Sequence, residues 1–102
     1  MTRDQFLTEL MGEKWIVFTE EDAEVYKCSV DVLTKNNNPN FSLWPDKGRL
    51  LDFVMGQEWH FDFEDWVGHS DGYCDTEDDM MFTKYLIDNL AELVASYKGW
   101  KP

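Results

Sequence analysis

The spacing of apolar residues near the C-terminal end is the feature that most constrains the fold. Large apolar side chains recur there at every third or fourth position: Phe82, Leu86, Leu90, Leu93 and Tyr97. Because an α-helix turns once every 3.6 residues, this spacing aligns them along one side of a helix. Thr76 and Asp79 have the spacing of a helix-capping box. We therefore predict one long, continuous helix from Glu77 to about Lys98.

Other segments favour β-structure. Residues Lys14–Thr19 are rich in β-branched and aromatic side chains, which is typical of a strand. Apolar and polar residues alternate over Glu24–Leu33 and again over Trp59–Glu64, the two-residue period of a strand with one buried side. Phe41–Trp44 is a candidate for a further short strand. These segments predict a small antiparallel sheet.

Two shorter helices are expected before the C-terminal one. Thr2 can cap a helix over Arg3–Met11, and Gly12 can end it. A second helix should begin after Pro45 and end at Gly56. The predicted fold is therefore α+β, with an antiparallel sheet of about three to four strands packed by helices. At 102 residues the chain is expected to form a single domain, 1–102.

Negative charge is concentrated in the second half of the chain. Residues 1–49 contain nine acidic and six basic side chains, whereas residues 50–102 contain twelve acidic and three basic ones. No Lys or Arg occurs between Arg49 and Lys84, and ten Asp or Glu residues lie in that interval. Crowding like charges raises the electrostatic repulsion within a compact state, so we expect a function to compensate for this cost.

We expect the acidic interval to bind a basic surface of another protein. On a strand, Asp62 and Glu64 would stand roughly 6.6 Å apart, close to two steps of the ~3.4 Å phosphate spacing of one DNA strand. Exposed aromatic residues in nearby loops, with Trp44 as a further candidate, can anchor such a complex. The predicted partner-binding residues are Asp62, Glu64, Asp65, Trp66, Asp71, Tyr73, Asp75, Glu77, Asp78 and Asp79.

The predicted function is inhibition by occupying the nucleic-acid-binding surface of a basic target, as a DNA or RNA mimic. In size and charge the chain resembles the small acidic inhibitors that phages direct against restriction or CRISPR machinery. It also resembles acidic immunity proteins and antitoxins that neutralise basic nuclease toxins, and this alternative stays open. The competing interpretation is a solvated acidic face that keeps an aromatic-rich domain soluble, with the aromatic residues packed in the core.

Catalytic and metal-dependent functions are not expected. His60, Asp62 and Glu64, with His69, Asp71 and Cys74 nearby, have suitable metal-ligand types, but their spacing matches no zinc motif. The segment Asp71–Asp79 has the carboxylates of a calcium loop without its spacing or its distal Glu, so it should bind cations weakly. A metal-dependent enzyme or regulator is the third, weaker alternative. The sequence predicts no cofactor and no metal site. Chelators should therefore leave the fold and the binding activity intact, and metal analysis of the dialysed protein should find no bound metal.

The scattered basic residues argue against direct binding to nucleic acid or to an anionic membrane. The apolar runs are far shorter than the roughly 20 residues needed to cross a bilayer. The first residues also lack the apolar core of a signal peptide. Cys28 and Cys74 have no CxxC spacing, which favours reduced thiols. We therefore expect a soluble, cytoplasmic protein.

Overall fold

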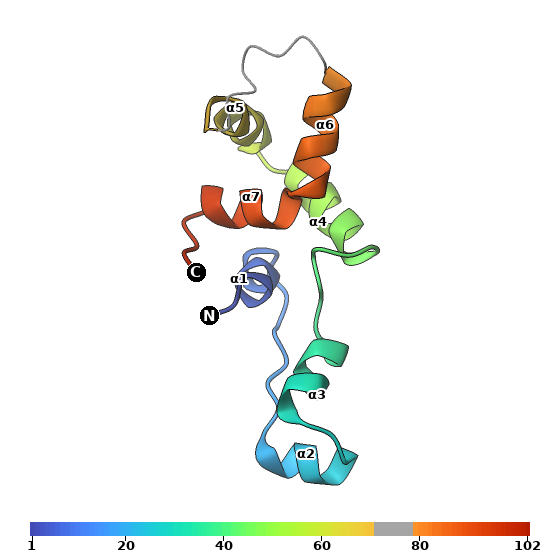
Figure 1. Ribbon diagram of the computed structural model, residues 1–102. Coiled ribbons are helices and arrows are strands. Elements are labelled where there is room, and N and C mark those ends of the chain that lie inside the picture. The colour runs from blue at the N-terminus through green and yellow to red at the C-terminus, as the bar shows by residue number, and fades with distance from the viewer. Residues whose placement is uncertain (71–78) are drawn as a thin grey trace.

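The computed structural model describes residues 1–70 and 79–102, and the side chains of residues 1–68 and 83–102. Over the described residues the chain forms seven helices and no strand (Figure 1). The prediction of an α+β fold with a small sheet is therefore wrong, and the described chain is all-helical. The helices are α1 (Arg3–Leu10), α2 (Glu20–Tyr26), α3 (Val30–Asn37), α4 (Asp46–Met55), α5 (His60–Ser70), α6 (Asp79–Asp88) and α7 (Leu90–Tyr97).

The first predicted helix is confirmed as α1. The Thr2 hydroxyl accepts a hydrogen bond from the Gln5 backbone N–H at 3.2 Å, so the N-cap is the residue that the sequence indicated. The helix ends before Gly12, whose φ of +77° lies in the left-handed region that glycine tolerates best. Leu7 and Thr8 are its buried side chains.

The predicted strand over Glu24–Leu33 is replaced by the helices α2 and α3. Thr19 and Asp22 form a reciprocal capping box that begins α2 at Glu20. Ser29 then caps α3 by accepting a hydrogen bond from the Val32 backbone N–H at 3.2 Å. These local hydrogen bonds satisfy helix-end amides, and they outweigh the weak β-propensity of the alternating residues.

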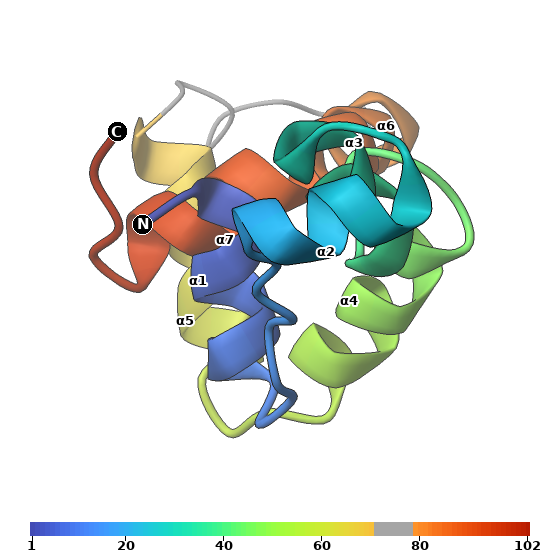
Figure 2. The same ribbon diagram turned by 90° about the horizontal axis from the view of Figure 1, so that it is seen from below.

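Residues Lys14–Thr19, predicted as a strand, form an extended segment with neither helix nor strand structure. This segment leads into α2 and α3, which lie at the opposite end of the molecule from α5 and α6 (Figure 1; Figure 2 gives a second view). The molecule is elongated, with principal extents of 54 × 23 × 22 Å. We call residues 16–38, which contain α2 and α3, the arm.

The side chain of Asn38 fastens the two ends of the arm together. Its amide oxygen accepts a hydrogen bond from the Ile16 backbone N–H at 2.7 Å, and its amide nitrogen donates to the Ile16 carbonyl at 2.9 Å. The same nitrogen lies 2.9 Å from the Thr34 carbonyl. One side chain thus pairs with Ile16 much as a neighbouring strand would.

Replacing Asn38 by alanine is expected to loosen the arm without unfolding the rest of the molecule. The change removes the two hydrogen bonds to Ile16, each with a net contribution of about 0.5–1.5 kcal/mol. The free energy of local opening at Ile16 should therefore fall by about 1–3 kcal/mol. Hydrogen exchange of the Ile16 amide measures this. Asn37→Ala is the matched control, because Asn37 bonds only within α3, to the Leu33 carbonyl. Equal exchange rates in the two variants would contradict the role of Asn38.

The second predicted helix is confirmed as α4, between Pro45 and Gly56, whereas the predicted strand at Phe41–Trp44 is not formed.

Arg49 of α4 donates hydrogen bonds to Asp46 in its own helix and to Glu13, which precedes the arm. The bond to Glu13 raises the pKa of Arg49, with Asp46 contributing in the same direction against the effect of desolvation. Because the Arg49 and Glu13 side chains are about two-fifths exposed, we expect Arg49→Met to cost less than about 1 kcal/mol in urea denaturation.

The segment Trp59–Glu64 forms the start of α5 and not a strand. Its alternating pattern is real, but Trp59, Phe63 and Val67 are also spaced four residues apart, which is the period of a helix. Phe63 and Val67 are fully buried. The rings of Trp59 and Tyr97 lie within 6.1 Å and 5.4 Å of the Phe63 ring, measured between centroids. Burial of this helical stripe decides the structure of the segment.

The prediction of a single long C-terminal helix is also wrong in one respect, because Asn89 divides this region into α6 and α7. Asn89 has non-helical dihedral angles, and its side-chain amide donates to the Tyr85 carbonyl at 3.0 Å. Asparagine competes for backbone hydrogen bonds in this way, which weakens a continuous helix. The chain turns there, and α7 runs across the direction of α6 (Figure 1).

Helix α7 is the centre of the hydrophobic core. It contacts α1, α4, α5 and α6, and Figures 1 and 2 show it between them. Five of its eight residues are buried: Leu90, Ala91, Leu93, Val94 and Ala95. The small residues Ala91 and Ala95 leave room for neighbouring helices to approach closely. The predicted core positions Leu86, Leu90 and Leu93 are buried as expected, but they pack against helices and not against a sheet.

Candidate protein-binding surface

The structure places part of the predicted binding surface on one helix. Asp62, Glu64, Asp65 and Trp66 belong to α5, and Asp79 is the first residue of α6. The remaining predicted residues lie outside the described residues: Asp71, Tyr73, Asp75, Glu77 and Asp78.

The helical geometry of α5 changes which carboxylates lie together. Successive helix positions turn by about 100°, so Asp62 and Glu64 are about 200° apart and point to opposite sides. The phosphate-like spacing expected for that pair on a strand is therefore wrong. Asp62 and Asp65, three positions apart, are neighbours on the helix surface, with Cβ atoms roughly 5–6 Å apart. Both are exposed, whereas Glu64 is half-buried.

Phe61 lies beside these two carboxylates and is 72% exposed. Its ring contacts that of His60 at a centroid distance of 3.8 Å, and the His60 ring nitrogen Nδ1 is 3.0 Å from the Gln57 carbonyl. We call Phe61, Asp62 and Asp65 the α5 outer face. Sequence reasoning missed Phe61 because a strand would have buried it on the same side as Phe63.

Trp66 is not an exposed anchor. Its side chain is half-buried and stacks on Phe63 at a centroid distance of 6.4 Å, and it contacts Tyr97 at 5.4 Å. Trp66 thus belongs to the aromatic part of the core, as the competing interpretation of these aromatic residues held. Trp44, in contrast, is 62% exposed, and the Lys47 ammonium lies 5.9 Å from its ring centroid.

A second group of carboxylates, outside the predicted binding residues, lies on α2. This helix contains Glu20, Glu21, Asp22 and Glu24 and no basic residue. The capping signal of Thr19 with Asp22 three positions later could have identified the helix. Acidic side chains therefore occur near both ends of the elongated molecule, on α2 and on α5.

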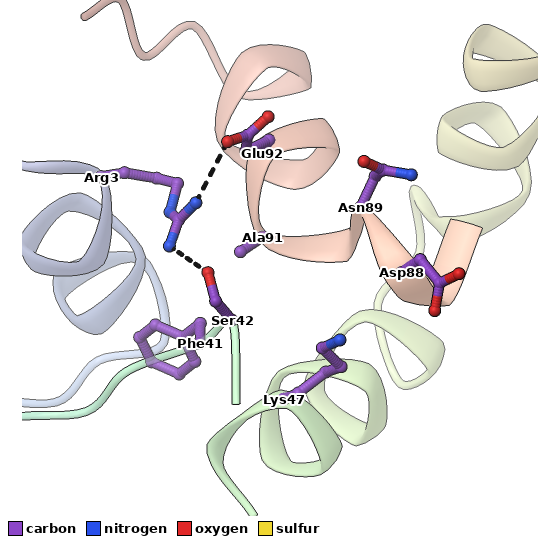
Figure 3. A pocket seen from close by; sticks show the side chains of 8 residues that line it. All are labelled: Arg3, Phe41, Ser42, Lys47, Asp88, Asn89, Ala91 and Glu92. Carbon is purple, nitrogen blue, oxygen red and sulfur yellow. Dashed lines mark hydrogen bonds and ion pairs between the residues drawn. The ribbon is translucent and has the colours of Figure 1, made fainter. Parts of the chain in front are cut away.

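Two of the hollows among the described residues are well defined, and both are smaller than a typical ligand pocket. The first, of about 90 Å³, lies between Arg3, Phe41, Lys47 and the start of α7 (Figure 3). Arg3 bridges it by donating to Ser42 at 2.6 Å and to Glu92 at 3.4 Å. The second, of about 260 Å³, lies beside Trp15 at the base of the arm. Ligand pockets usually measure about 300–1,000 Å³.

Within the described part of the chain, no three His, Cys, Asp or Glu side chains are grouped closely enough to hold a metal ion. Of the metal-ligand types considered from the sequence, His69, Asp71 and Cys74 have no described side chain. Among the described helices, none combines the length and the apolar character that crossing a membrane requires.

No known protein family, curated protein or solved structure matches this chain. The exposure and the charge of its own residues therefore carry the functional argument.

Proposed function

We propose that this chain is an acidic inhibitor that binds the basic, nucleic-acid-binding surface of a target protein through the α5 outer face. One observation carries the proposal: an aromatic ring that is 72% exposed lies beside two exposed carboxylates, in an interval of 34 residues without Lys or Arg. The proposal places the protein in the cytoplasm together with its target.

The charges of the α5 outer face suit a surface that binds phosphates. A nucleic-acid-binding protein presents Lys and Arg side chains to the phosphate backbone. Asp62 and Asp65 offer carboxylates to the same cations, and the net charge of −12 adds a long-range attraction. Charge complementarity of this kind raises association rates above the ~10⁵–10⁶ M⁻¹s⁻¹ of neutral pairs. The inhibitor and the nucleic acid would then compete for one surface.

Phe61 supplies the apolar contact that charge alone does not provide. Hot spots of protein interfaces are enriched in large side chains near the centre of the buried area. In the free protein the ring of Phe61 is mostly in contact with water, and its exposure is a cost that binding would remove. A central ring flanked by carboxylates is therefore consistent with an anchor inside an acidic contact.

Reversing the two charges should weaken binding to the target mainly by slowing association. We expect D62K/D65K to lower the association rate about tenfold, or about 1.4 kcal/mol, and to reduce its salt dependence. The fold should survive, because both side chains are exposed. Asp62 lies in the first turn of α5, so the loss of its helix-dipole interaction should cost about 0.3–1 kcal/mol. The proposal is tested by measuring how fast this protein associates with the target protein. The measurement is made at several salt concentrations, with and without competing nucleic acid.

The matched control is E9K/D52K, which makes the same change in net charge on exposed residues of α1 and α4. We expect it to slow association by less than about threefold. If the control slows association as much as D62K/D65K does, the α5 outer face is not the binding surface. If the target binds this protein and nucleic acid at the same time, the mimic mechanism is wrong.

A further inference from the structure

Among its described residues, the arm exposes several large apolar side chains and buries few. Its buried apolar residue, among those described, is Leu33 at 7% exposure, and it does not belong to the main core. Half of the ten large apolar side chains exposed in the described chain lie on the arm, although it holds only about a quarter of the described side chains. They are Ile16 (45%), Val17 (75%), Val25 (73%), Tyr26 (63%) and Val32 (45%).

Short helices with this exposure need further contacts for stability. Isolated helices of fewer than about 12–15 residues are marginal in water, and α2 and α3 have seven and eight residues. Contacts between helices in the arm are mainly those of α2 with α3. An excess of exposed large apolar side chains on one segment is typical of a binding surface.

The charges of α2 indicate what covers this surface. Glu20 and Glu24 are four positions apart, and like charges at this spacing repel. Glu21 lies one turn before Val25, so an apolar side chain of the arm stands next to carboxylates. All four charges of α2 are negative. A basic partner would relieve the repulsion and cover the apolar residues together.

Hydrogen bonds within the arm also fix the backbone of its binding surface before a partner binds. The Asn38 side chain joins Ile16 to the end of α3, and the Thr19–Asp22 capping box fixes the start of α2. Both fasten the backbone that carries the exposed residues. A preorganised surface loses less conformational entropy when a partner binds.

We propose that the arm is a second docking surface, separate from the α5 outer face, which binds a basic amphipathic helix of a protein partner. The apolar side of that helix covers Val25 and Tyr26, and its Lys or Arg side chains meet the carboxylates of α2. A second copy of this chain suits the surface poorly, because pairing two arms brings four carboxylates from each α2 together. This inference goes beyond the proposed function and does not depend on the target of α5.

A synthetic peptide of about 18 residues, or five helical turns, tests the inference directly. The probe has leucines along one side and lysines along the other. One control peptide replaces the lysines by glutamates, and a second replaces the leucines by serines. Fluorescence anisotropy gives the affinities, and amide chemical shifts of the labelled protein locate the binding site. We expect the Lys/Leu peptide to bind at least about tenfold more tightly than either control, with shifts centred on residues 16–32.

Two variants of the arm separate its apolar and its charged contributions. V25S/Y26S and E21Q/E24Q change only exposed side chains and should each weaken the Lys/Leu peptide about tenfold or more. The matched control is L43S/M55S, which removes two exposed apolar side chains outside the arm and should change the affinity less than about twofold. Unchanged circular dichroism of each variant confirms that it is folded.

Several results would overturn the inference. They are an equal loss of affinity in L43S/M55S, equal binding of the leucine-free lysine peptide, or chemical shifts centred on α5. A dimer in sedimentation experiments that V25S/Y26S dissociates would assign the arm to a second copy instead. The variant D62K/D65K separates the two proposals, because it should associate more slowly with the target of the α5 outer face and still bind the peptide at the arm with unchanged affinity.

Discussion

Truncation of Phe63 to alanine is expected to lower the free energy of unfolding by about 3–5 kcal/mol. The Phe63 side chain is fully buried and meets the rings of Trp59, Trp66 and Tyr97. Its removal leaves a cavity among rigid rings that cannot close around a methyl group. Typical domains are stable by only about 5–15 kcal/mol, so the variant should be close to unfolding. Urea denaturation followed by tryptophan fluorescence measures the loss.

The control for this prediction lies two positions earlier in the same helix. Phe61→Ala removes an identical ring that is 72% exposed, and it should change stability by less than about 0.5 kcal/mol. Comparing Phe63→Ala with Phe61→Ala also tests whether this segment is a helix or a strand, because a strand would place both rings on one buried side. Similar large losses in the two variants would contradict the helical α5.

Leu90→Ala should have the second-largest effect on stability, a loss of about 2–5 kcal/mol. Leu90 is 1% exposed and begins α7, the helix that contacts α1, α4, α5 and α6. Alanine is an excellent helix former, so the loss would come from packing and not from the backbone. Chemical denaturation at equilibrium gives the value from the midpoint and the slope.

Leu43→Ala is the corresponding control, since this leucine is 61% exposed. We expect its unfolding midpoint to stay close to that of the original chain. A loss below about 1 kcal/mol for Leu90→Ala would mean that the side chain is not enclosed, and α7 would then have to be rotated about its axis.

The two helices that the sequence predicted correctly, α1 and α4, have local signals at both ends, whereas the capping signals of α2 and α3 were overlooked. Thr2 and Gly12 mark α1, and Pro45 and Gly56 mark α4, because capping and the restriction of proline depend only on neighbouring residues. Of the apolar positions predicted for the C-terminal region, Leu86, Leu90 and Leu93 are buried, whereas the side chain of Phe82 lies outside the described residues. The interruption of the predicted helix at Asn89 was not foreseen, because asparagine weakens a helix only where its side chain bonds to the backbone, as Asn89 does to the Tyr85 carbonyl.

The predicted strands failed for a different reason. Alternation over Trp59–Glu64 fits a strand of six residues, but the stripe of Trp59, Phe63 and Val67 appears only when the window extends to a third turn of helix. The strand predicted from this short window put Asp62 and Glu64 on the same exposed side. It also put Phe61 on the buried side, although Phe61 is exposed. The acidic interval itself was visible from the sequence, whereas the side of α5 that presents its charges required the helix.

The central position of α7 has a consequence for the order in which the chain can fold during synthesis. Residues 90–97 leave the ribosome after every helix that they cover, so the apolar side of α1 has no partner from α7 until then. At ~5–20 residues per second, the delay between α1 and α7 is roughly 4–17 s. Until α7 emerges, the apolar segments of α1, and later those of α4 and α5, are open to contact with other nascent chains. The excess of Asp and Glu acts already at this stage, since like-charged unfinished chains repel one another and aggregate less readily.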